Sequence, residues 1–233
     1  MRRAGGRAAV TVVVALVFAL AAEYPVAAAA KPLSARDRAI LAAGAIQRSD
    51  VPPGWGAHKQ GAGTAAQLKG ITACKQLATV VNAASLTVPH RMSQAFSDPT
   101  SSTQTTLVAN TAYAFKDVAS AEGYLAAYRG SSVPTCFTQA LQRSVKGSLN
   151  GLTGTISVAP LTNLAGLGDA EVGYSLTLTI SAQGQQETLY DDLVAVQVGR
   201  AVLGFNFQNL GAELPTGPTI IRSATSRVAP LAT

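Results

Sequence analysis

The chain has 233 residues, a formal net charge of +6 and only 13% charged residues. This length is sufficient for one domain with a substantial hydrophobic core. The basic residues are scattered and are not interleaved with aromatic side chains, so the composition does not favour nucleic-acid binding.

Residues 1–30 have the layout of a secretory signal peptide. Arginines near the start precede an apolar run over 8–22, and small residues at 27–30 provide a cleavage site before Lys31. The run is shorter than the roughly 20 apolar residues that a bilayer span requires; an uncleaved N-terminal anchor is the alternative. No cysteine stands between the run and Lys31, where attachment of a lipid would require one. We therefore expect a secreted or cell-wall-associated protein that is not a lipoprotein and has no membrane span in the mature chain.

Residues 31–233 are expected to form a single exported domain, with an N-terminal helical extension over 31–49. Ser34 and Asp37 have the spacing of a weak capping box. The prolines within Asp50-Val-Pro-Pro-Gly-Trp55 end this segment, because consecutive prolines stop a helix.

Three more helices are expected between residues 72 and 146, and two of them carry cysteines. The first covers 72–84 and holds Cys74, the second follows Asp117 or Ser120, and the third covers 134–146 and holds Cys136. Two cysteines allow one intramolecular pairing, and exported proteins meet an oxidising compartment. We therefore expect a Cys74–Cys136 disulfide. A nucleophilic thiol or a redox centre is the weaker alternative, since no CxxC motif is present.

Strand patterns dominate the rest of the chain. Residues 105–116 alternate imperfectly between apolar and polar, residues 170–181 alternate cleanly, and Thr216 opens a last helix. This order predicts an α+β fold in which helices pack on one face of a curved antiparallel β-sheet.

Gly199-Arg200 is a two-residue loop of the kind typical of a type II′ hairpin. Pairing outward from this loop places Val194 opposite Phe205 and then Asp192 opposite Phe207. Because an isolated carboxylate on that dry face is unfavourable, we expect a bulge or a strand start near Asp191-Asp192.

No pattern identifies a catalytic or metal centre. His58 and His90 lie apart without metal-ligand spacing, and the chain has no nucleophile elbow, dinucleotide loop or phosphate loop. We therefore expect no metal and no cofactor. Asp169, Glu171, Asp191 and Asp192 are the remaining acid–base candidates. Asp191 and Asp192 would point to opposite faces of a strand, and Asp169 fits the role of a turn-stabilising residue better.

Several short motifs follow one another in a characteristic order over roughly residues 45–230. These are Asp50-Val-Pro-Pro-Gly-Trp55, Cys74, a strand ending in Phe115, Cys136, Gly168-Asp169-Ala-Glu171 leading to Tyr174, and Val196-Gln-Val-Gly199-Arg-Ala-Val202. In this order they resemble actinobacterial exported proteins related to the extracellular sensor domain of receptor-type Ser/Thr protein kinases. The resemblance implies a sandwich-like α+β domain with a cleft for an unknown ligand. The kinase sensor domains carry two disulfides, whereas this chain can form only one.

These observations favour a non-enzymatic, sensor-like domain of the cell envelope that binds a small or apolar ligand or an envelope protein. The candidate ligand-binding residues are Trp55, Tyr113, Tyr174 and Phe205, each of which has core packing as its alternative role. The alternative function is a cell-envelope hydrolase that uses carboxylate or Ser/His chemistry. It requires a carboxylate or a serine to meet His58 or His90 in one cleft.

Overall fold

The computed structural model describes residues 33–60, 68–98, 106–146, 153–182 and 185–233, so the expected signal peptide lies outside the described residues. The helices are α2 (Ala35–Gly44), η2 (Arg48–Asp50), η3 (Thr72–Cys74), α4 (Lys75–Thr87), α5 (Val118–Tyr128), α6 (Val133–Lys146) and α7 (Gly217–Ala232). The strands are β1 (Gly56–His58), β2 (His90–Met92), β3 (Ala95–Ser97), β4 (Leu107–Ala114), β5 (Thr153–Pro160), β6 (Ala170–Ala182), β7 (Gln185–Val198) and β8 (Ala201–Leu210).

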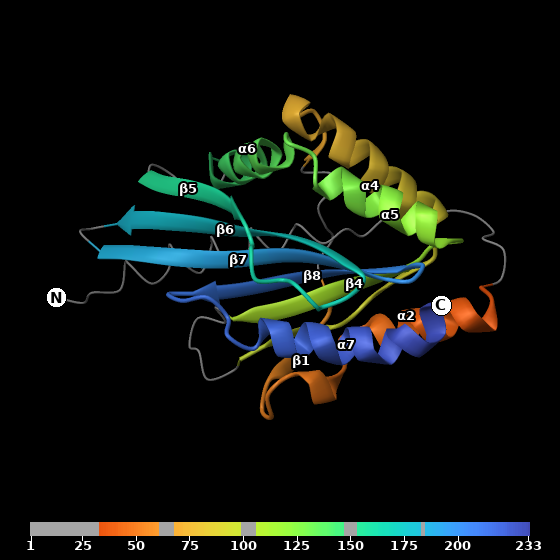
Figure 1. Ribbon diagram of the computed structural model, residues 1–233. Coiled ribbons are helices and arrows are strands. Elements are labelled where there is room, and N and C mark those ends of the chain that lie inside the picture. Colours follow the sequence, from red (N-terminus) through yellow and green to blue (C-terminus); the bar gives the residue numbers. More distant parts are fainter. Residues whose placement is uncertain (1–32, 61–67, 99–105, 147–152, 183–184) are drawn as a thin grey trace.

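All of these strands belong to one antiparallel sheet, which Figure 1 shows nearly edge-on. The strand order is β1-β3-β4-β8-β7-β6-β5, and β2 also pairs with β4. The predicted α+β class with a single antiparallel sheet is confirmed. Strands β4, β8, β7 and β6 lie in the interior of the sheet, where they position the candidate site.

The β7–β8 hairpin has the register that its sequence predicts. Val194 pairs with Phe205 and Asp192 with Phe207. Gly199 adopts a φ of 52°, a conformation that glycine reaches without steric penalty. The hairpin loop is also held by Asp169, whose Oδ2 accepts a hydrogen bond of 2.6 Å from the Gly199 backbone N–H.

The expected bulge or strand start near Asp191-Asp192 is wrong, because β7 runs without interruption from Gln185 to Val198. Hydrogen bonds to both carboxyl groups explain why the strand continues without a bulge. Asp192 is only partly buried and is hydrogen-bonded to the side chain of Ser175 on β6. Asp191 points to the opposite face, where two amide side chains donate to it.

Helices cover both faces of the sheet rather than the one face that the sequence predicts. Helices α4, α5 and α6 lie on one side and α2 and α7 on the other (Figure 1). The reason is that β7 and β8 are apolar on both faces: Val194 and Val196 point toward α7, whereas Leu193 and Ala195 point toward α5. We name the two sides the α4–α5–α6 face and the α2–α7 face.

The α2–α7 face is densely packed. The first helix begins at the predicted cap, where Ser34 Oγ accepts a hydrogen bond of 2.9 Å from Asp37 N–H. Gly44 lies so close to the sheet that a Cβ there would be 2.7 Å from Leu203 Cδ2. Arg227 of α7 forms a bidentate pair with the buried Asp50 at 2.7 and 2.8 Å. The N- and C-terminal helices are therefore joined by packing and by an ion pair.

The Cys74–Cys136 disulfide is confirmed. It joins the end of η3 to α6, with a Cα–Cα distance of 4.7 Å and a sequence separation of 62. Both cysteines are fully buried. The bridge therefore fixes the α4–α5–α6 layer over its face of the sheet.

Candidate ligand-binding site

A row of small side chains crosses the α4–α5–α6 face of the sheet. Thr111 pairs with Gly204, Gly204 with Ala195, and Ala195 with Val172, so one residue from each of four adjacent strands lies in line. Directly paired residues present their side chains to the same face. Thr111, Gly204 and Val172 are only partly buried although their strands lie inside the sheet. This row leaves space beneath the helices.

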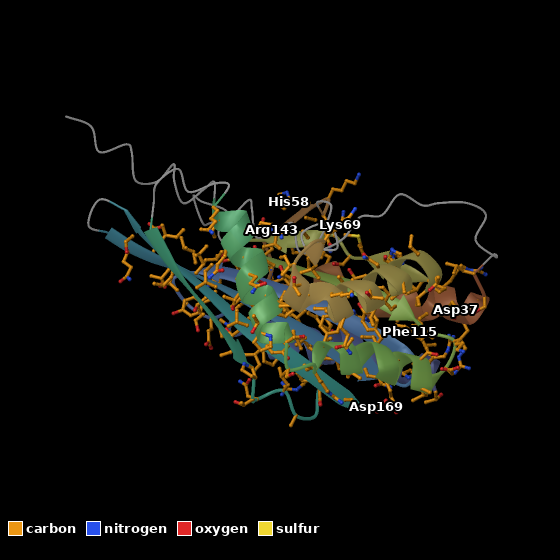
Figure 2. All side chains as sticks on the ribbon, turned by 90° about the horizontal axis from the view of Figure 1, so that it is seen from above. Asp37, His58, Lys69, Phe115, Arg143 and Asp169 are labelled. Carbon is orange, nitrogen blue, oxygen red and sulfur yellow. A yellow bond between two sulfur atoms is a disulfide. The ribbon has the colours of Figure 1, made fainter. Side chains whose placement is uncertain are left out.

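Large side chains from the helices form a roof above this row. They are Leu77 and Val81 of α4, Tyr124 and Tyr128 of α5, Phe137 of α6, and Leu68. The segment that carries Leu68 is attached to α6, because Arg143 Nη1 donates a hydrogen bond of 2.7 Å to the Lys69 carbonyl oxygen (Figure 2). Floor and roof enclose a cavity of ≈130 Å³.

Tyrosines give the cavity a wall that is aromatic and neutral. Tyr124 and Tyr128 share a hydrogen bond of 3.2 Å between their hydroxyl groups. The Tyr174 hydroxyl donates to the carbonyl oxygen of Tyr128 at 2.8 Å. Burial raises the pKa of the Tyr124, Tyr128 and Tyr174 hydroxyls above the usual value. These hydroxyls are therefore neutral, hydrogen-bonded groups over the physiological pH range.

A buried carboxyl group lies beyond one end of the cavity. Asn206, which borders the cavity, donates from Nδ2 to Asp191 Oδ1 at 2.5 Å. Gln208 Nε2 lies 3.3 Å from the other oxygen of Asp191. Burial raises the pKa of Asp191 to about 8, against the effect of these two hydrogen bonds and aided by the nearby charge of Asp192. At neutral pH this carboxyl group is mostly protonated.

Gln60 borders the cavity at the opposite edge, next to β4. Its Nε2 donates to the Asn110 carbonyl oxygen at 3.2 Å and lies 3.3 Å from Ser93 Oγ. Its Oε1 is buried and has no hydrogen-bond partner among the described residues. Gln60 also borders a polar groove of ≈440 Å³, around which Arg48, Lys59 and Arg91 are placed.

A larger groove of ≈630 Å³ lies on the other side of Tyr124. Its walls are mostly apolar residues from the second half of α4 and the end of β4. At its mouth Arg200 forms an ion pair of 2.7 Å with Asp37 and donates to the Phe115 carbonyl oxygen (Figure 2). Burial opposes ionisation of Asp37, but the hydrogen bonds from Ser34 and Arg200 outweigh it and lower its pKa. Tyr124 borders both the groove and the cavity.

The four predicted ligand-binding residues fall into two groups. Tyr113 and Tyr174 lie on the α4–α5–α6 face and border the cavity. Phe205 also borders it, but its side chain is on the other face, where its ring stacks on Phe207 at 5.9 Å. Trp55 is partly buried against the core of the α2–α7 face. The structure therefore brings two of the four side chains together at the cavity.

The carboxylates that the hydrolase hypothesis names have structural partners instead of a histidine. Asp169 holds the β7–β8 loop, and Glu171 Oε1 accepts a hydrogen bond from the Leu167 backbone N–H. Figure 2 shows His58 and Asp169 at opposite margins of the molecule.

One histidine does meet a serine, since His58 Nε2 lies 2.8 Å from Ser97 Oγ. Ser97 is only 4% exposed, and neither residue borders the cavity or the two grooves. This pair is therefore separate from the cavity and from both grooves. His90 lies elsewhere, with its Nδ1 3.1 Å from the Val88 carbonyl oxygen.

Metal-binding clusters and membrane-spanning helices are both absent from the described residues. Within the described ranges, no cluster of three or more His, Cys, Asp or Glu side chains has the arrangement of a metal site. In the same part of the chain, no helix is both long enough and apolar enough to cross a bilayer.

Sequence reasoning missed three residues that shape the cavity, namely Gln60, Gly204 and Asn206. Gly204 gave a usable signal, because a glycine inside an apolar strand often marks a place where something approaches closely. Gln60 gave none, since its position depends on the pairing of distant strands.

No family model matches the chain, and no curated protein matches it either. Among solved structures, the chain is similar to the extracellular domain of PknH from Mycobacterium tuberculosis. The sequence identity is 9%, the TM-score is 0.40, and the match covers 68% of this chain and 75% of the other. At this level of similarity the match does not establish a family and carries no argument about function.

Proposed function

We propose that the protein is an exported, non-enzymatic domain that binds a small apolar ligand in the cavity between the sheet and the α4–α5–α6 layer. The observation that carries this proposal is the row Thr111–Gly204–Ala195–Val172 beneath a roof of large side chains. Protein interiors are normally close-packed and leave few voids larger than a water molecule. A cavity of this size with aromatic walls therefore supports the binding of a ligand.

The size and chemistry of the cavity limit the guest. An engineered protein cavity of about 150 Å³ with apolar walls binds benzene, and the cavity here has ≈130 Å³. It accommodates one ring or a short branched chain. Typical ligand pockets of about 300–1,000 Å³ are larger, and the adjoining groove of ≈630 Å³ falls within that range. A longer ligand would occupy both spaces.

Two further observations support the other parts of the proposal. The Cys74–Cys136 disulfide is compatible with an oxidising compartment, as expected for an exported chain. The candidate carboxylates Asp169 and Glu171 are occupied by backbone N–H groups, which favours structural roles over catalytic ones.

Native mass spectrometry of the protein purified from its own host, compared with a denatured sample, tests the proposal. We expect a bound mass that is lost on denaturation. The variant Gly204→Leu is the key comparison, because a Cβ at Gly204 meets only the Thr111 carbonyl oxygen, at 3.9 Å, and a larger side chain there fills the cavity.

Gly123→Leu is the matched control, since Gly123 lies on the exposed side of α5 with no atom within 4 Å of a built Cβ. The Gly204 variant is expected to fold and to lose the bound mass, whereas the Gly123 variant retains it. A bound mass that both variants retain, or binding of no apolar compound by the wild-type protein, would contradict the proposal.

A further inference from the structure

The orientation of the Gln60 side-chain amide is fixed by its neighbours. The Asn110 carbonyl oxygen can only accept a hydrogen bond, so the amide nitrogen of Gln60 must face it, as observed at 3.2 Å. Ser93 Oγ donates its one hydrogen to the Gln94 carbonyl oxygen at 2.7 Å, so it also accepts from Gln60. Both neighbours therefore require nitrogen at this position, and turning the amide over is unfavourable.

This orientation leaves Gln60 Oε1 as a buried acceptor without a partner among the described residues. The residue is only 8% exposed and borders the cavity. A buried polar atom without a hydrogen bond destabilises the fold, because it has lost its hydration without gaining a partner. A partner supplied by a ligand removes that penalty only in the bound state.

Three hydroxyl groups and one amide of the cavity wall are already engaged in hydrogen bonds. The Tyr124, Tyr128 and Tyr174 hydroxyls are joined to one another or to backbone, and Asn206 Nδ2 donates to Asp191. Of the residues that border the cavity, Gln60 has a buried oxygen acceptor without a hydrogen bond among the described residues.

We propose that the ligand of the cavity is a compact, ring-sized apolar molecule with one hydrogen-bond donor, and that Gln60 Oε1 accepts this hydrogen bond. The inference rests on the proposed function, and it specifies the ligand class as phenol-like rather than purely hydrocarbon. The aromatic walls contact the ring, and Gln60 fixes its orientation and selects against a guest that lacks the donor.

Phenol and toluene are suitable probes because they have nearly the same size and differ in whether they carry a donor. Titration calorimetry measures both with the wild-type protein and with Gln60→Leu. We expect phenol to bind the wild-type protein, and Gln60→Leu to weaken phenol binding at least tenfold while toluene binding stays within about twofold. Tenfold corresponds to about 1.4 kcal/mol, which is near the value of one hydrogen bond.

Gln197→Leu is the matched control. Gln197 is also a buried glutamine with an unpartnered Oε1, but it does not border the cavity. Its replacement is expected to leave the affinities for both probes unchanged.

Anisole, which keeps the oxygen of phenol but has no hydrogen to donate, provides a test on the wild-type protein alone. We expect anisole to bind more weakly than phenol. If toluene binds and phenol is neither preferred over anisole nor weakened by Gln60→Leu, the ligand-class inference is wrong while the proposed function stands. If no probe binds the wild-type protein, both are wrong.

Discussion

The two faces of the sheet are formed by alternate residues of the same strands, yet they are packed differently. On the α2–α7 face the helices approach so closely that Gly44 has no room for a Cβ beside Leu203. On the α4–α5–α6 face Gly204 has open space above it. The size of the residues at alternate positions of β4, β7 and β8 thus decides which face is filled and which holds a cavity.

Each side also has its own buried polar groups, and unpartnered atoms occur on both, since Asp192 Oδ1 on the α2–α7 face has no hydrogen-bond partner among the described residues. On the α2–α7 face, Asp50 receives hydrogen bonds from Arg227, Ser223 and the Gln47 backbone N–H. On the α4–α5–α6 face, Gln60 has an unpartnered oxygen, and Asp191 has a carboxyl group that is mostly protonated at neutral pH. The comparison of packing indicates that the α2–α7 face is filled, whereas the α4–α5–α6 face leaves space for a site.

The largest expected effect concerns the disulfide that holds the roof. Replacing both Cys74 and Cys136 by alanine is expected to lower the free energy of unfolding by about 4 kcal/mol, because the bridge restricts a long loop in the unfolded chain. Chemical denaturation measures the loss. Reducing agent should destabilise the wild-type protein similarly and leave the double variant unchanged, and a loss below about 1 kcal/mol would contradict the prediction.

The ion pair of the α2–α7 face is expected to have the next largest effect. Arg227→Met leaves the carboxylate of Asp50, which is 2% exposed, without its cation and is expected to destabilise by about 3 kcal/mol. Arg222→Met on the exposed side of α7 is the control and should change stability by less than about 0.5 kcal/mol. Equal effects of the two variants would show that the pair does not hold the helices.

The buried acid of the α4–α5–α6 face predicts a pH dependence. Asp191 keeps its proton to about pH 8 in the folded protein but releases it near its ordinary pKa of 3.8 when unfolded. Between these values the unfolded state binds fewer protons, so the free energy of unfolding falls as pH rises from about 4 to 8. Asp191→Asn removes this dependence, so it is expected to stabilise the protein increasingly as the pH rises from about 4 toward 8 and by nearly nothing at pH 4.

Unfolding curves at several pH values measure this change, with Glu122→Gln, an exposed carboxylate of α5, as the control. The control should keep the slope of the wild-type protein. A slope that Asp191→Asn leaves unaltered would show that this group ionises normally in the folded protein.

The smallest effects are expected at the two glycines, and they differ in sign. Gly44→Ala places a methyl group 2.7 Å from Leu203 Cδ2 and 3.0 Å from Ala112 Cβ, which should destabilise by about 1 kcal/mol. Gly204→Ala adds a methyl group to open space in a strand and should stabilise by about 0.5 kcal/mol. Thermal unfolding measures the change in Tm for both variants. Shifts of the same sign would contradict the inferred difference in packing between the two faces.

The local features of this fold were predictable from sequence. Gly199-Arg200 set the β7–β8 register, and the presence of just two cysteines in a chain expected to be exported indicated the bridge. The second helical layer was not predictable, because α2 and α7 meet through residues that are far apart in the sequence, as the hydrogen bond from Arg227 Nε to the Ala43 carbonyl oxygen illustrates. The continuous β7 was missed because the amide donors of Asp191 come from another strand.

The candidate site was predictable only in part. Tyr113 and Tyr174 were chosen as aromatic side chains, and both border the cavity. Phe205 and Trp55 were chosen on the same ground, and their side chains lie on the other face. Aromatic character alone cannot distinguish the two faces. The distinction requires the β4–β8 pairing that brings Thr111 beside Gly204, which no local pattern encodes.

Tyr124 has a consequence for how much the site can hold. It is the one side chain of α5 that borders both the cavity of ≈130 Å³ and the groove of ≈630 Å³. The partition between the two spaces is thus an aromatic ring on rotatable bonds and not a stretch of backbone. A ligand too long for the inner space therefore has to displace the Tyr124 ring from its contacts with the rings of Tyr113, Phe115 and Tyr128, and not a segment of backbone.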